Sequence, residues 1–175
     1  MENFKNFLDL VEKRKSIRSY KSDAVEKEKL YYILEAFRLA PSAKNLQPWK
    51  LIVITDKAII QELVPACRNQ AFIAEAPVVI AVCVKEEEAY ATMGGYLNSS
   101  PVDVGISFEH LMLAAAEQGL GSCWIGAFNE KEVGKVLGVP ENARVAALTP
   151  VGYPDAHGRE RKRKSVEEVV SYNKY

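Results

Sequence analysis

The stretch GLGSCWIGAFNEKEVGKVLGVPENARVAALTPVGYP, residues 119–154, predicts a strand, a helix and a second strand in close succession. Asn129 is expected to cap a helix over 130–137, because its side-chain oxygen can accept a hydrogen bond from the first turn. The segments on either side, 122–127 and 145–152, have the length and apolar character of buried strands. This stretch therefore predicts a sheet with at least one helix packed on it.

The segment just before it, 102–118, has the length of a helix and is apolar nearly all round. A helix without a polar face lies either in the centre of a domain or between two subunits. Gly119 and Gly121 are expected to end it, because glycine readily takes the left-handed conformation that follows a helix.

Further out, two apolar runs rich in β-branched residues predict buried strands, WKLIVIT at 49–55 and PVVIAVCV at 77–84. A loop separates the first of them from the helix before it. Charged residues follow the second, at 85–88, where a solvated turn is expected.

Three more helices are predicted in the first half of the chain. The first is expected where apolar residues recur at helical spacing, at Phe4, Phe7, Leu8 and Val11. Asp23 and Glu26 resemble a capping box for the second, which should stop at Ala40 because a proline follows. The third, over 57–64, is expected to end at Pro65.

The composition fits one globular domain over residues 1–175, with 159–175 as a polar, basic C-terminal arm. Apolar residues make up 48% of the chain and charged residues 26%, so a sizeable core can form without disulfides or metal. Because helices alternate with strands, the pattern indicates an α/β or α+β fold with a sheet packed between helices.

Several classes of partner are disfavoured by the residue counts. Acidic and basic residues balance at 23 each, which gives no overall field for nucleic acid. The three cysteines are far apart, and with only two histidines they do not favour a metal centre; such cysteines are typical of a reduced, cytoplasmic protein. The N-terminal sequence lacks the apolar run of a signal peptide, and no apolar segment is long enough for a membrane span.

Two basic clusters nevertheless lie near opposite ends of the chain, at 13–18 and 159–164. In an extended segment alternate side chains share a face, so Arg14, Ser16 and Arg18 should point the same way. Two guanidinium groups with a hydroxyl between them suit a phosphate or a ring oxygen. The alternative is a solvated turn and a solvated tail; the functional interpretation is that the tail folds back onto the same phosphate.

Two other segments have both a functional and a plainer interpretation. The loop PSAKNLQPW at 41–49 offers polar groups to a planar heterocycle, or simply connects a helix to a strand. The glycines around Cys123 match neither a GxGxxG nor a P-loop pattern, although Gly126 would allow close approach of a ligand to the backbone. Cys123 itself is interpreted as a small buried side chain rather than a nucleophile.

Five segments, in this order and spacing, resemble the nitroreductase family of FMN-dependent oxidoreductases. They are RKSIRSY at 14–20, APSAKNLQPWKLIVI at 40–54, APVVIAV at 76–82, the stretch at 119–154, and RERKRKSVEEVV at 159–170. The resemblance implies an α+β sandwich with a central, mostly antiparallel sheet flanked by helices. It also implies an intertwined homodimer with two identical FMN sites at the subunit interface, in which 102–118 would form the dimer core.

The resemblance implies flavin contacts of two kinds. Residues that match the family's contacts to the phosphate and the pyrimidine edge are Arg14, Lys15, Ser16, Arg18, Arg161 and Arg163. Residues that match its contacts to the ring system are Pro41, Ser42 and Asn45 from the other subunit, Asn69 or its neighbour Gln70, and the backbone of Ile125 and Gly126 near flavin N5 and O4.

The implied function is ping-pong transfer of hydride from NAD(P)H to a small organic acceptor such as a nitroaromatic or a quinone. No acid–base side chain is required, so no catalytic residue is assigned. A non-catalytic flavin store or redox sensor is the alternative, because the same residues would serve it. The segment 85–100 is shorter than in larger relatives, so the acceptor is not determined. The pocket is either uncovered or covered by Tyr90, Met93, Tyr96 and Leu97, for which ordinary packing is the alternative interpretation.

Overall fold

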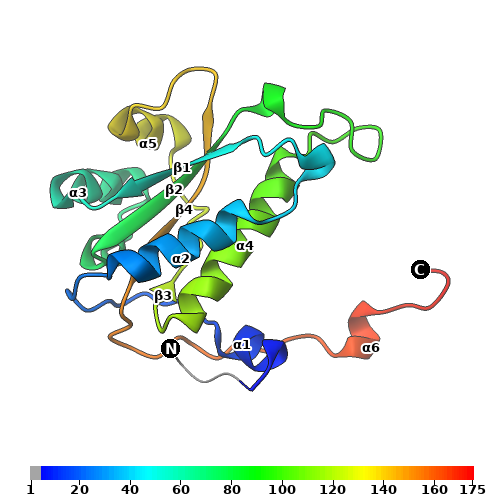
Figure 1. Ribbon diagram of the computed structural model, residues 1–175, viewed down its shortest axis with the longest axis horizontal. Helices are drawn as coiled ribbons and strands as arrows, with labels where there is room; N and C mark the ends of the chain where they lie inside the picture. Colours follow the sequence, from blue (N-terminus) through cyan, green and yellow to red (C-terminus); the bar gives the residue numbers. More distant parts are fainter. Residues whose placement is uncertain (1–4) are drawn as a thin grey trace.

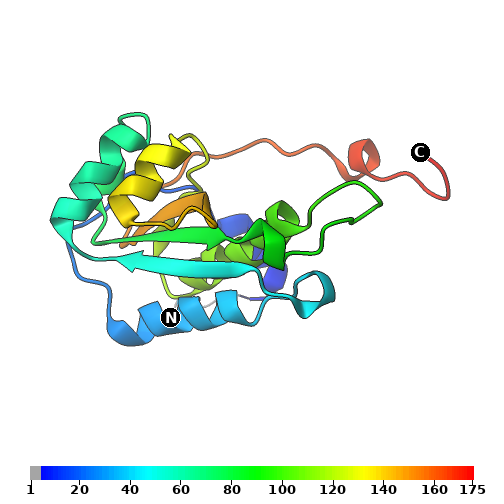
Figure 2. The same ribbon diagram turned by 90° about the horizontal axis from the view of Figure 1, so that it is seen from above.

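The computed structural model describes residues 5–175, and in it four strands form one antiparallel sheet between two layers of helices (Figures 1 and 2). The strands are β1 (Trp49–Ile54), β2 (Val78–Val84), β3 (Gly121–Ser122) and β4 (Arg144–Gly152), in the spatial order β1-β2-β4-β3. The two apolar runs form strands where the sequence predicted them. The antiparallel sheet between helices confirms the α+β sandwich.

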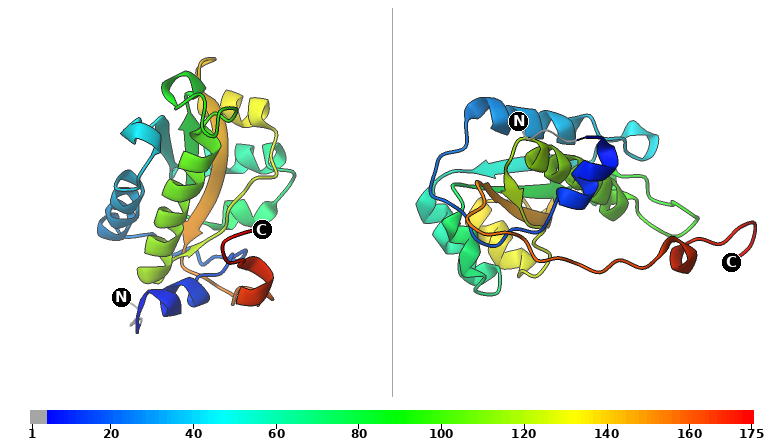
Figure 3. Two further views of the ribbon diagram at one scale, coloured as in Figure 1. Left: turned by 90° about the vertical axis from the view of Figure 1, so that its right-hand side faces the viewer. Right: turned by 90° about the horizontal axis from the view of Figure 1, so that it is seen from below.

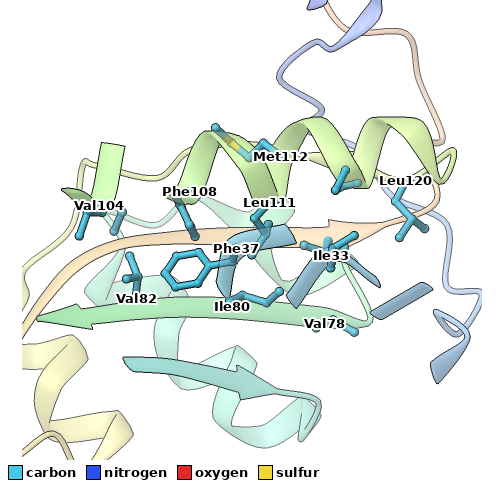
Figure 4. Close-up of a cluster of buried hydrophobic side chains, with 14 of the residues drawn as sticks. Ile33, Phe37, Val78, Ile80, Val82, Val104, Phe108, Leu111, Met112 and Leu120 are labelled. Carbon is cyan, nitrogen blue, oxygen red and sulfur yellow. The ribbon is translucent and has the colours of Figure 1, made fainter. Parts of the chain in front are cut away.

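The central strand β2 is buried along its whole length because helices cover both faces of the sheet. Successive side chains of a strand point to opposite faces. One set packs with Phe37 of α2 (Lys27–Arg38) and Phe108 of α4 (Ser100–Glu117), as Figure 4 shows. These β2 residues are Val78, Ile80 and Val82.

The other set of β2 side chains forms a second core with the opposite helical layer. That layer consists of α3 (Lys57–Ala66) and α5 (Glu130–Leu137). Val79 and Ala81 pack there with Leu63 and Val133, all of them fully buried. Asn129 caps α5 through its side chain, as the sequence predicted, and Gly138 follows in the left-handed conformation.

Two predicted helix boundaries in the first half of the chain are wrong. Glu26, not Asp23, is the N-cap of α2, and it makes no capping bond because its carboxylate accepts the Tyr153 hydroxyl at 2.7 and 2.8 Å. Pro65 does not stop α3 but lies in its last turn. A proline so near the end removes only one helical bond, and the Cys67 N–H still closes the turn on Leu63.

The predicted strand at 122–127 is shorter than expected. Only Gly121 and Ser122 pair regularly with β4, and Ile125 makes a single bridge to Leu148. The predicted helix at 102–118 is α4, which starts slightly earlier and ends before Gly119, whose φ is +74°. No helix within residues 5–175 is both long and apolar enough to cross a membrane.

The segment after α1 lies beside the chain that follows β4, at one side of the sheet. Helix α1 (Phe7–Lys13) packs near α4; Phe4, the first residue of its predicted apolar pattern, lies outside the described residues. Residues 14–21 then run along the chain that follows β4, as Figure 3 shows. The C-terminal arm, residues 159–175, leaves the body as an exposed, extended segment with one short helix, α6 (Val166–Val169).

Candidate functional site

A cleft of about 740 Å³ lies between residues 11–18, α4 and the beginning of the C-terminal arm. Six residues that the resemblance implied for the phosphate line it together: Arg14, Lys15, Ser16, Arg18, Arg161 and Arg163. They come from positions more than 140 residues apart, and the fold places them around one space. Arg159 adds a further cation, and Glu12, Glu109 and Glu160 add carboxylates.

The first basic segment is fixed to the body by its backbone. The Ile17 N–H donates to Ser122 O at 2.9 Å, and Ser16 pairs in parallel with the same residue. A Cβ placed on Gly121 would lie 2.8 Å from the Ile17 side chain, and one on Gly158 would lie 2.5 Å from the Cβ of Lys15. The segment thus passes between Gly121 and Gly158, at distances from both that a residue with a side chain would not allow.

The residues that follow hold this segment at its far end. The buried Tyr20 donates its hydroxyl to Ile17 O at 2.7 Å, and its N–H donates to Glu75 at 3.1 Å. Burial raises the pKa of the Tyr20 phenol well above its usual range, so the hydroxyl remains a donor. The Lys21 N–H donates to Tyr153 O at 2.9 Å, which joins the segment to the chain after β4.

The carboxylate of Glu109 interrupts the positive charge of the cleft. Its Oε1 lies 3.5 Å from Arg14 Nε, and the Arg14 side chain is only 17% exposed. Burial raises the pKa of Glu109, and Arg14 opposes that shift. Glu109 therefore competes with any anion for Arg14.

Cys123 lies buried beside the same cleft. Burial raises the pKa of its thiol, while Arg18 and Ser16 lower it. Its net shift is upward, so the thiol is predominantly protonated near neutral pH. This agrees with its interpretation as a small buried side chain.

The predicted ring-binding loop does not line this cleft. Pro41, Ser42 and Asn45 follow the C-terminal end of α2, and the loop's contact with α4 is at the first turn, where the Ala43 N–H donates to Asp103 at 2.8 Å. Arg14 contacts α4 six residues further on, at Glu109. Within one copy of the chain, the loop and the basic cleft are therefore separate.

The remaining positions that the resemblance implied for the flavin ring lie just after strand β3, at 125–126, and on the neighbouring chain at 69–70. Asn69 is exposed in the left-handed conformation, with φ +55°. Gln70 instead donates its amide to Cys67 O at 2.8 Å and to Ala127 O at 3.0 Å, which fixes the chain next to Gly126. Ile125 is buried and its N–H donates to Leu148 O, whereas Gly126 is exposed.

Sequence reasoning did not assign two residues that the structure places at the cleft or against its side chains. Glu109 lines it, and the Phe72 ring lies 6.0 Å from the Arg18 guanidinium carbon. Glu109 had a usable signal, because it is one of few charged residues in an otherwise apolar helix. Phe72 had none, since its approach to Arg18 depends on tertiary packing.

The comparisons with known proteins agree with one another. A model described as the nitroreductase family matches residues 11–74 and 66–153. An NADH dehydrogenase of Thermus thermophilus is 34% identical, over 90% of this chain and 91% of the relative. A solved nitroreductase family protein from Clostridium difficile superposes with a TM-score of 0.88 at 33% identity, over 97% of this chain and 99% of that one.

A second solved structure, an FMN-dependent nitroreductase from Clostridium difficile R20291, is 32% identical and has a TM-score of 0.79. The superposition covers 95% of this chain and 98% of the chain of that structure. The family model thus extends from residue 11 to residue 153, the sequence relative and both structures cover 90% or more of the chain, and this chain belongs to the nitroreductase family.

Proposed function

We propose that this protein binds FMN non-covalently and transfers reducing equivalents from NAD(P)H to a small organic acceptor such as a nitroaromatic or a quinone. The observation that carries the proposal is the meeting of cations from both ends of the chain in one cleft. Family membership and the FMN-dependent solved relative support the same cofactor.

The residues of the cleft fit the phosphate of FMN. Arginine side chains offer paired donors that match phosphate oxygens, and bonds between charged partners are roughly twice as strong as neutral ones. Arg14 and Ser16 would hold the phosphate from the fixed segment. Arg161 and Arg163 would close on it from the arm.

The ring system would extend from the cleft toward the end of the short strand. Lys15 or Arg18 would face the pyrimidine edge, where a cation stabilises negative charge on the reduced ring. Because the Ile125 N–H is already bonded to Leu148, the Gly126 N–H is the donor that we propose for the N5 side. Asn69, exposed nearby on the chain that Gln70 anchors, would add a polar contact.

We further propose that two copies form an intertwined homodimer in which each supplies the loop at 41–45 to the other's flavin. The loop lies away from the basic cleft of its own copy, so it reaches a ring only from a second one. Exposed apolar side chains support this assembly. Phe7 and Leu8 of α1 are 66% and 69% exposed, and Val166 and Val169 of the arm are each 64% exposed.

FMN would supply the two-electron redox chemistry when bound, and the protein would supply placement and charge. The fixed cations would hold the phosphate, the exposed backbone at Gly126 would face the N5 side of the ring, and donor and acceptor would bind there in turn. No side chain is assigned to move a proton. The separate, buried thiols of the three cysteines support a reduced compartment, and we propose the cytoplasm.

An absorbance spectrum of the purified protein, followed by anaerobic addition of NADH or NADPH, tests the proposal. Yellow flavin bands that bleach on addition and return with an acceptor are the expected result. Bands that never bleach would favour the flavin store or sensor instead. A colourless protein that FMN does not reconstitute would refute both.

A further inference from the structure

A buried carboxylate, Asp103, lies in the first turn of α4 and is 2% exposed. One oxygen, Oδ1, accepts the N–H of Ala43 at 2.8 Å. The other, Oδ2, accepts the hydroxyl of Ser99 at 2.7 Å. Asp103 therefore contacts two segments that are more than 50 residues apart in the sequence, and each uses a different oxygen.

The first of these segments is the loop at 41–47, whose backbone is unusual. Lys44, Asn45 and Gln47 have φ values of +51°, +56° and +50°, a left-handed conformation that residues with side chains rarely adopt. Local bonds hold part of it, since the Ser42 hydroxyl accepts the Gln47 N–H at 3.0 Å. Such a backbone persists only where its surroundings determine it, and the bond from Ala43 to Asp103 attaches it to the body.

The second segment is the one at 89–99, which holds the four residues that form one of the two alternatives for covering the pocket, and which we call the cover segment. The buried Ser99 hydroxyl, which donates to Asp103, also accepts the N–H of Tyr90 at 3.1 Å. The Tyr90 ring in turn lies 4.3 Å below the ammonium group of Lys44, in the loop. The two segments thus meet directly at their surfaces and again, through Asp103, in the interior.

We propose that Asp103 is a positioning residue that sets the ring-binding loop through Ala43 and the cover segment through Ser99. The inference rests on the proposed function and deepens it. One buried carboxylate determines both how the flavin ring is held and how the acceptor is admitted. Because each oxygen serves one segment, the two effects are separable.

Ala43→Pro removes only the donor to Asp103 in the loop. Ser42 is extended, with φ −140° and ψ 162°, which suits the residue before proline, and Ala43 is the first residue of its short helix, where proline is tolerated. We expect the FMN Kd, measured by fluorescence quenching, to rise about tenfold or more, because the loop is no longer held in place and has to be ordered when the ring binds. Hydrogen exchange should quicken in the loop more than in 89–99.

Ser99→Ala should give the complementary result. It keeps the Asp103 acceptor for the Ala43 N–H and removes the hydroxyl that links Asp103 to the cover segment. We expect FMN Kd to stay within about twofold of wild type, while KM for 1,4-benzoquinone or 4-nitrobenzoate rises more than kcat falls. Exchange should quicken in 89–99. Ser107→Ala is the matched control, since this buried hydroxyl of α4 bonds only to backbone oxygens of its own helix.

A simple loss of stability would shift FMN Kd and KM together, in proportion to the fall in Tm, and that pattern would overturn the proposal. So would a folded Ala43→Pro variant with unchanged FMN Kd and unchanged exchange. These outcomes presuppose a wild type that binds FMN. A wild type that does not would instead refute the proposed function, and with it this role of Asp103.

Discussion

Two segments bring cations to the same cleft, and the fold holds them in opposite ways. Residues 14–18 pass between Gly121 and Gly158 and are fixed by backbone hydrogen bonds, so that Arg14 is 17% exposed. Residues 159–163 of the arm are exposed throughout. Arg161 and Arg163 therefore approach the cleft from a segment that the body hardly contacts.

This difference indicates how the two halves contribute to binding. Cations that are already in place lose little conformational entropy when an anion arrives. Cations on an extended arm must be ordered by the ligand or by a second copy of the chain, and that ordering offsets part of their attraction. We therefore expect unequal effects from equal changes of charge.

The largest effect should follow from removing both fixed arginines. Arg14→Ala with Arg18→Ala should lower FMN affinity about 100- to 10,000-fold, because each charge-assisted bond contributes roughly 1.5–3 kcal/mol. Fluorescence titration with FMN measures it. Arg38→Ala with Arg144→Ala removes the same charge from exposed sites outside the cleft and is the control. Equal losses in both variants would show that only net charge matters.

A somewhat smaller effect is expected from crowding the fixed segment. Gly121→Ala would place a methyl group 2.8 Å from the Ile17 side chain, and forcing the two apart should cost about 1–3 kcal/mol of unfolding free energy. Denaturant unfolding measures the loss, and FMN affinity should fall with it. Gly134→Ala, in α5 with its nearest contact at 3.9 Å, is the control and should be neutral or stabilising. A fully stable Gly121→Ala protein would show that the segment is not tightly held.

The arm should matter less than the fixed segment. Arg161→Ala with Arg163→Ala should lower FMN affinity about tenfold, below the loss for the fixed pair, because ordering the arm offsets part of each bond. Removal of 159–175 should have at least this effect and should also weaken the dimer, which light scattering after gel filtration measures. If the arm variants lose as much affinity as the fixed pair, the contrast between the two segments is wrong.

The smallest effect concerns Glu109, whose carboxylate competes for Arg14. Glu109→Gln should raise FMN affinity at neutral pH roughly two- to fivefold, the size expected for a partly exposed charge pair. Because burial raises its folded-state pKa, Glu109 stabilises the apoprotein below its unfolded pKa, and that contribution is lost as pH rises through the folded pKa. The Tm of the wild type should thus fall relative to the Tm of Glu109→Gln as pH rises above the usual pKa range of glutamate. A difference in Tm that does not change with pH would contradict this.

The sequence predicted best where the information is local. β1 and β2 form where apolar β-branched runs stand, and Asn129 caps α5 as its side chain allows. The sequence-based prediction failed where a residue far away in the sequence determines the local structure. Glu26 does not form a capping box because Tyr153, 127 residues away, takes its carboxylate.

The candidate site divides in the same way. The alternation of Arg14, Ser16 and Arg18, with the family resemblance, predicted a cleft that the fold does assemble. Two features of the site could not be predicted from the sequence pattern: the carboxylate of Glu109 in the cleft and the hydrogen bond that attaches the 41–47 loop to Asp103. Both depend on where α4 lies relative to segments that are far from it in the sequence.

The hydrogen bonds of residues 14–21 also have a consequence for biosynthesis. Ile17 pairs with Ser122 and Lys21 with Tyr153, so this segment leaves the ribosome long before its partners exist. At about 5–20 residues per second, Lys21 waits roughly seven to twenty-six seconds for Tyr153, its partner after β4. The segment of the basic cleft that is synthesised first is therefore fixed in place only after Tyr153, near the end of the chain, has been made.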